Sequence, residues 1–191
     1  MRCGGGRGIG LSLAALLAVA PGPIRAQDVG LGFGGATMYG GAVVPEASKV
    51  GVAFGARVAF ARIIRPDLHL GMAVDWWTAE RDARALDVRD IVSGLDLWKD
   101  FRLTDLLRPF VGVAVGLHSV DASREEVGDG QDPRSEAISG FRVGAGGFAG
   151  TALRATSTGA IWLVLEYRYS LASRVSNHEI RGGLRILAPG G

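Results

Sequence analysis

Apolar and polar residues alternate one by one over four long stretches of the chain. From Val50 to Phe60, valine and phenylalanine at every second position alternate with glycine, alanine and Arg57. The stretches 68–76, 111–117 and 161–169 repeat this pattern. Successive side chains of a strand point to opposite faces of a sheet, so this spacing gathers the apolar residues on one face, which a helix would not do. The pattern therefore predicts four amphipathic β-strands.

Four further segments, at 28–39, 91–103, 138–153 and 179–187, show a weaker alternation in which glycine takes many positions. The adjacent glycines Gly146 and Gly147 predict a bulge in the third of these segments. Between the eight segments there is no long helical pattern and no linker to a second domain. We therefore predict an all-β fold of eight antiparallel strands in up-and-down order.

The predicted connections differ in length between the two ends of the strands. Those after the second, fourth and sixth strands are short, at 65–67, 104–108 and 154–158. Those after the first, third and fifth strands are longer, at 40–49, 80–90 and 121–136, and the connection 172–178 is intermediate. Short turns at one rim and longer loops at the other are typical of transmembrane β-barrels. We expect the charged loop 121–136 to be extracellular and mobile.

Alternation alone does not show whether the apolar face points into the barrel or away from it. The other face consists of glycine and alanine with isolated charges, which suits a narrow barrel interior better than a surface in water. Charges of both signs inside a barrel can neutralise one another, as buried charges require. We therefore predict lipid-facing apolar residues and an interior charge network. Its predicted members are Arg57, Asp75, Asp96, Arg142, Glu166, Arg168, Arg181 and Arg185.

The N-terminus has the features of a secretory signal peptide. Arg2 and Arg7 precede an apolar stretch at 9–20, helix breakers follow, and Ala26–Gln27 offers a small-residue cleavage site. A single membrane-anchor helix is the alternative, although this apolar stretch is short. We predict a signal peptide at 1–26 and a barrel domain at 27–191. Of the 21 basic residues, three fall in the removed segment, which leaves 18 against 19 acidic residues.

The strand opening Arg108-Pro-Phe-Val-Gly-Val-Ala-Val-Gly116 is similar to one found in a known group of proteins. With the signal peptide and the eight amphipathic strands, the chain resembles the small eight-stranded outer-membrane proteins, the OmpA/OmpX-like β-barrel families, over about residues 28–187. The resemblance implies a porin-like, monomeric barrel in the outer membrane of a Gram-negative bacterium. It also implies contact with outer-membrane lipid and lipopolysaccharide, and insertion by the barrel assembly machinery. The chain ends at Gly191 without the terminal aromatic residue usual in that group.

These features predict a structural or surface-interaction role, because eight strands enclose a lumen wide enough only for side chains. One alternative is an enzyme that modifies lipid A, with Ser176 and His178 as nucleophile and base and Glu179 or Glu166 orienting the histidine. Another is a secreted, lipocalin-like binder of apolar ligands.

Other candidate chemistry is weak. The glycines at 30–35 match a dinucleotide-binding pattern by spelling, but no strand precedes them and no helix is predicted after them. His69, His118 and His178 lack metal-ligand spacing. We therefore predict no cofactor and no metal. We also predict no nucleic-acid partner, since the mature chain is nearly neutral. Tyrosine and tryptophan near strand ends could form interfacial girdles, with Trp98 and Trp162 filling the lumen instead; the girdle candidates are Tyr39, Trp76, Trp77, Tyr167 and Tyr169.

Overall fold

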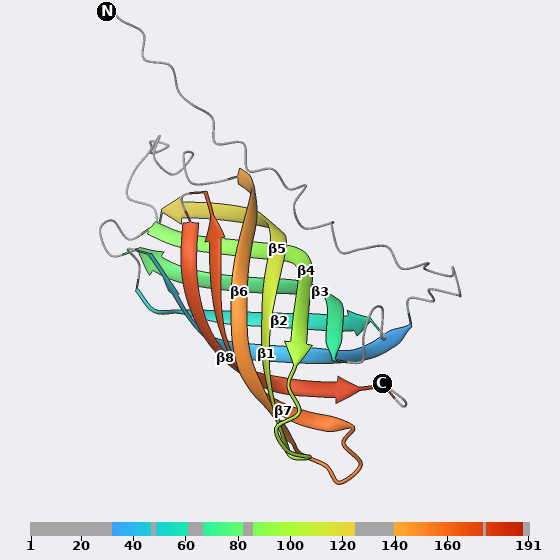
Figure 1. Cartoon of the computed structure of the whole chain (residues 1–191). Helices are drawn as coiled ribbons and strands as arrows, with labels where there is room; N and C mark the ends of the chain where they lie inside the picture. The colour runs from blue at the N-terminus through green and yellow to red at the C-terminus, as the bar shows by residue number, and fades with distance from the viewer. Residues whose placement is uncertain are drawn as a thin grey trace, which may run out of the picture. The chain divides into compact units, whose positions relative to one another are not determined.

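The structure is a computed structural model that describes residues 32–46, 49–60, 67–81, 86–124, 140–173 and 175–188 (Figure 1). The predicted signal peptide lies outside these residues. Eight strands follow one another along the chain: β1 (Phe33–Pro45), β2 (Gly51–Phe60), β3 (Leu68–Arg81), β4 (Leu86–Asp100), β5 (Leu107–Arg124), β6 (Gly140–Arg154), β7 (Ile161–Ala172) and β8 (Val175–Leu187). None of the described segments forms a helix that could span a membrane.

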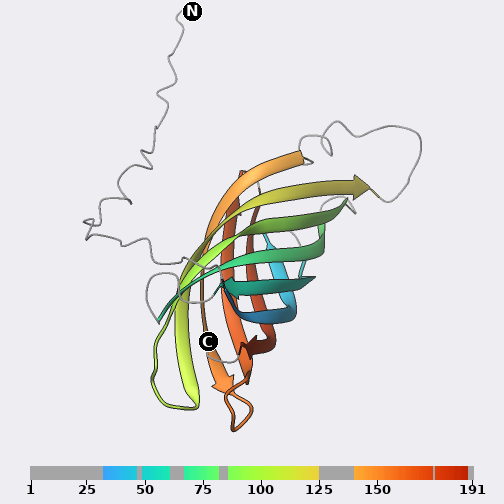
Figure 2. The ribbon, with the colours of Figure 1, turned by 90° about the vertical axis from the view of Figure 1, so that its right-hand side faces the viewer.

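Each strand pairs antiparallel with the next, and β8 closes the barrel against β1. The pairing is staggered: if we start at Ala36 and follow the paired residues around the barrel, we return to Glu46, the residue directly after the end of β1. The residues passed on the way are Val58, Met72, Leu95, Val115, Ala145, Leu171 and Ser176. A staggered barrel requires tilted strands, and the tilt is visible in Figures 1 and 2. The predicted eight-stranded up-and-down barrel is confirmed.

The apolar side chains of the strands point outward. On β4, Ile91 and Leu95 are exposed, whereas Asp96 on the other face is buried. Arg89 and Lys99 bracket the apolar outward positions of this strand. Ten residues at about 3.3 Å each, tilted by about 40°, span roughly 25 Å, which matches the apolar band of an outer-membrane barrel. A water-soluble, lipocalin-like barrel would face the opposite way, so this alternative is wrong.

The strands are longer than predicted at one rim. β1 continues to Pro45 and β4 begins at Leu86, so the expected loops 40–49 and 80–90 are mostly strand. The reason is that inward side chains here, including Val43 and Trp77, pack into an apolar cluster and need strand geometry to face it. At this rim the connection between β5 and β6, at 125–139, stays long, whereas the others shorten to 46–50, 82–85 and 173–174. The prediction that all connections at this rim are longer than those at the other rim is therefore wrong, and only the β5–β6 connection fits it.

Candidate functional site in the barrel interior

Seven charged side chains meet in the middle of the barrel, each at most 4% exposed. Three are guanidinium groups and four are carboxylates, and they come from β2, β3, β4, β7 and β8. We call this set the ion cluster; it consists of Arg57, Arg168, Arg181, Asp75, Asp96, Glu166 and Glu179.

Each arginine of the ion cluster contacts more than one carboxylate. Arg57 Nε donates to Asp96 Oδ2 at 2.6 Å, and its Nη2 donates to Glu166 Oε1 at 3.1 Å. Arg181 donates to Glu166 Oε1 from Nη2 at 2.7 Å and to Asp75 Oδ1 from Nη1 at 2.6 Å. Such charge-assisted bonds connect strands on opposite sides of the lumen and stabilise the closed interior.

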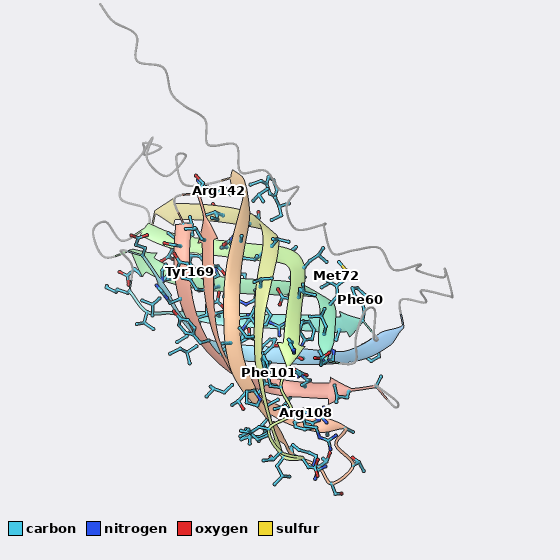
Figure 3. All side chains as sticks on the ribbon, viewed as in Figure 1. Phe60, Met72, Phe101, Arg108, Arg142 and Tyr169 are labelled. Carbon is cyan, nitrogen blue, oxygen red and sulfur yellow. The ribbon has the colours of Figure 1, made fainter. Side chains whose placement is uncertain are left out.

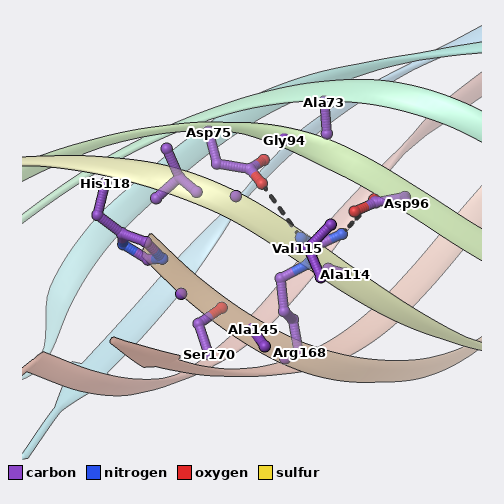
Figure 4. A pocket seen from close by; sticks show the side chains of 14 residues that line it. Ala73, Asp75, Gly94, Asp96, Ala114, Val115, His118, Ala145, Arg168 and Ser170 are labelled. Carbon is purple, nitrogen blue, oxygen red and sulfur yellow. Dashed lines mark hydrogen bonds and ion pairs between the residues drawn. The ribbon is translucent and has the colours of Figure 1, made fainter. Parts of the chain in front are cut away.

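Arg168 bridges two carboxylates of the ion cluster. Figure 4 shows its guanidinium between the carboxylates of Asp75 and Asp96. Its Nη1 lies 3.5 Å from Asp75 Oδ2, and its Nη2 donates to Asp96 Oδ2. Glu179 is held more loosely, because its contact is a 3.5 Å approach to Arg181 Nη1.

Aromatic rings surround the guanidinium groups. The Arg57 guanidinium carbon lies 4.5 Å from the ring centre of Phe148 and 5.1 Å from that of Tyr39. Arg181 lies 4.4 Å from the Tyr39 ring, and Arg168 lies 4.7 Å from the Phe148 ring. The ring faces attract the cations and restrict their orientation.

Apolar side chains fill the lumen on both sides of the ion cluster. On the side of the 125–139 connection they are Val43, Ala53, Trp77, Ala79, Val88 and Val120. On the other side they are Tyr39, Trp98, Phe110, Phe148, Ala152, Trp162 and Val164. The described interior is therefore packed with side chains along its length and leaves no wide passage.

Two aromatic predictions are wrong. Tyr39 and Trp77 were expected in the outward girdles but lie inside the barrel, because each shares its strand face with buried residues. Trp76, Tyr167 and Tyr169 do point outward.

A small cavity of about 20 Å³, enough for a water molecule, lies beside the ion cluster (Figure 4). His118 and Ser170 line it, together with glycines of β4, β5 and β6. His118 Nδ1 is 2.6 Å from Asp90 Oδ2, and a Cβ atom on Gly144 would lie 2.4 Å from His118 Nε2. Glycine is therefore needed at 144 to make room for the histidine ring.

Six of the eight predicted network residues belong to the ion cluster. Arg185 is also buried but contacts Asp100 at 3.3 Å, nearer one end of the barrel. Arg142 is half-buried at the opposite rim, near the start of β6 (Figure 3), where it donates to the carbonyl of Ser173. Arg142 therefore lies outside the ion cluster, because its position on β6 is beyond the level of that cluster. Glu179 was missed, although it shares the strand face of Arg181 and could have been found by alternation.

The candidate enzymatic pair does not form. His178 Nδ1 is 2.6 Å from the hydroxyl oxygen of Tyr167, and Ser176 Oγ donates to Glu46 Oε2 at 2.6 Å. Both Glu166 and Glu179 point into the barrel, so neither can orient His178, which lies on the outer surface.

Comparisons with known proteins agree with this architecture. Residues 67–187, more than half of the chain, match the family described as Opacity family porin protein. Among curated protein sequences no relative matches.

Solved structures of other small barrels share the fold, among them the following three. Neisserial surface protein A (NspA) has 17% identity and a TM-score of 0.60, over 80% of this chain and 95% of its own. Ail, the attachment invasion locus protein of Yersinia pestis, has 12% identity and a TM-score of 0.54, over 82% and 99%. The N-terminal β-barrel domain of Pseudomonas aeruginosa OprF has 13% identity and a TM-score of 0.53, over 82% and 99%. With its apolar outer face and its family match, the chain belongs to the Opacity family of porin proteins and is a small β-barrel of the bacterial outer membrane.

Proposed function

We propose that this barrel acts at the cell surface, through the rim that carries the β5–β6 connection, and that its transmembrane part is a rigid support. The observation that carries the proposal is the filled lumen. Three layers of buried side chains, two of them apolar, occupy the described interior. The filled interior therefore argues against a role in the passage of nutrient-sized solutes. The surface rim is the part of the barrel that is left to bind other molecules.

The structural relatives support a surface role. NspA is described as a surface protein and Ail as an attachment invasion locus protein. Ail has also been solved in complex with the heparin analogue sucrose octasulfate. Their barrels share the fold of this chain, and by analogy we place its ligand contacts in the outer loops.

We further propose that the barrel is monomeric, contacts outer-membrane lipid and lipopolysaccharide through its apolar band, and is inserted by the barrel assembly machinery. The signal peptide at 1–26 remains a prediction, which the intact mass of the mature protein tests.

Replacing 125–139 by a four-residue turn, in cells that display the protein, tests the surface role. We expect expression of the wild-type chain to increase adherence of the bacteria to epithelial cell layers, and the replacement to abolish that increase. The matched control replaces the opposite turn 155–160 and should leave adherence unchanged. Equal adherence with and without the wild-type protein would refute the proposal.

A further inference from the structure

Arginines converge at the end of the barrel opposite the β5–β6 connection. Arg108 of β5, Arg154 of β6 and Arg185 of β8 all occupy positions on the inward side of their strands. Arg154 and Arg185 are both register partners of Trp162. Figure 3 shows Arg108 near the turns of this end, far from Arg142 at the other rim.

Among the described residues, one carboxylate forms an ion pair with these arginines. Asp100 Oδ2 lies 3.3 Å from Arg185 Nη1 and also 3.3 Å from His69 Nε2. Two other carboxylates at this end contact different cations: Asp67 Oδ2 lies 3.3 Å from Lys99 Nζ, and Asp105 accepts a hydrogen bond from Arg102. That hydrogen bond from the Arg102 guanidinium holds the pKa of the exposed Asp105 carboxyl below its usual range. The inner surface of this mouth therefore has an excess of positive charge.

Aromatic rings hold the guanidinium groups at the mouth. The Arg108 guanidinium carbon lies 4.5 Å from the ring centre of Trp162. That of Arg185 lies 5.1 Å from the Phe110 ring and 6.0 Å from the Trp98 ring. Because the rings restrict both groups, their N–H donors are oriented in advance of any ligand.

Several of these donors have no partner among the described residues. They are Nε and Nη2 of Arg185, which is only 6% exposed, and Nε of Arg108. A buried charged N–H group without an acceptor is costly, since it has lost water and gained nothing in exchange. The mouth thus combines excess positive charge with oriented donors that need acceptors.

We propose that this mouth is an anion-binding site for a carboxylate or phosphate group, held by Arg185 and Arg108 with Arg154 at its edge. A guanidinium presents its N–H groups as a planar fork that matches the paired oxygens of either anion. One such group would neutralise the excess charge and satisfy the donors. With the β5–β6 connection at the cell surface, the mouth opens to the periplasm, so the ligand is a periplasmic molecule that carries this group.

The test uses the refolded full-length mature barrel in a non-ionic detergent, titrated with inorganic phosphate or with acetate. Sodium chloride at matched ionic strength corrects for screening. We expect a saturable rise of the unfolding temperature with at least one of the two anions, because a ligand that binds the folded state stabilises it. For phosphate, broadening of the ³¹P resonance by the protein gives a second measure of binding.

Two variants locate the site. Arg185→Gln should weaken the anion response at least tenfold, and Arg108→Gln, at a half-buried position that tolerates change better, should weaken it several-fold. Arg102→Gln is the matched control, because this exposed arginine pairs with Asp105, and it should respond like the wild type. A response that follows ionic strength alone, or that persists unchanged in Arg108→Gln and in any folded Arg185→Gln protein, would overturn the proposal.

Discussion

At the scale of single residues, the contribution of a buried carboxylate to stability depends on how many arginines it contacts in the ion cluster, and not on its charge alone. Glu166 accepts hydrogen bonds from Arg57 and Arg181, and Arg168 lies 3.4 Å from the same oxygen. Glu179, equally buried, has one long ionic contact within the described part of the barrel, to Arg181. Three guanidinium groups face four carboxylates, so one carboxylate charge is in excess. We therefore expect that replacing Glu166 lowers the stability of the barrel strongly, whereas replacing Glu179 changes it little.

Glu166→Gln should destabilise the barrel strongly. Removing this charge leaves buried arginines without their shared partner, which costs about 3–5 kcal/mol. The unfolding temperature in detergent measures the loss. Glu80→Gln is the control, since Glu80 forms an exposed ion pair with Lys49, a kind worth about 0–1 kcal/mol. Equal unfolding temperatures for the two variants would show that the buried bonds are not needed.

Glu179→Gln should be tolerated, with a change of about 1 kcal/mol or less. The amide keeps the shape of the side chain while it removes the excess negative charge, and little hydrogen bonding is lost. Urea or thermal unfolding in parallel with Glu166→Gln gives the comparison. If both variants lose the same stability, Glu179 is a full partner of the arginines and the charge argument is wrong.

At the scale of the strands, glycine has two different roles. On β8, a Cβ atom at Gly183 would lie 2.0 Å from the Met38 carbonyl oxygen of the neighbouring strand β1. At the neighbouring Gly182 the nearest atom would be the Val164 carbonyl oxygen at 3.8 Å. Gly183 therefore allows β8 and β1 to approach closely, whereas Gly182 faces outward with space around it.

Gly183→Ala should lower stability by about 1–3 kcal/mol, because backbone must shift to admit the methyl group. Gly182→Ala should change it by less than about 0.5 kcal/mol. The two variants differ by one position in the same strand, and their unfolding curves in the same detergent make the comparison direct. A larger loss at 182 than at 183 would contradict the register of β8 against β1.

At the scale of the whole barrel, the filled lumen predicts how solutes behave. Liposomes that contain the refolded wild-type barrel should exclude small sugars, because layers of buried side chains block the described interior. A wide porin in the same lipid provides the positive control. Liposome swelling in an isosmotic sugar solution is the measurement, and swelling at a rate close to that of the wide porin would disprove a closed lumen.

The sequence by itself determined the strands, their two faces and most of the buried charges. Side chains of an extended chain alternate between faces whatever the strand pairs with, so Arg57, Arg168 and Arg181 could be assigned to the interior from alternation alone. The choice of the apolar face as the outer one also followed from composition, since glycine and isolated charges suit a narrow lumen.

Only the tertiary structure decided which of those charges meet and where each strand ends. Arg57 of β2 reaches Asp96 of β4 and Glu166 of β7, because tilt and stagger set the height of every residue in the barrel. The same stagger places Arg142 at a rim, and packing around Trp77 extends strands into expected loops. Height along the axis depends on the closure of all eight strands together, and no local pattern of residues carries that information.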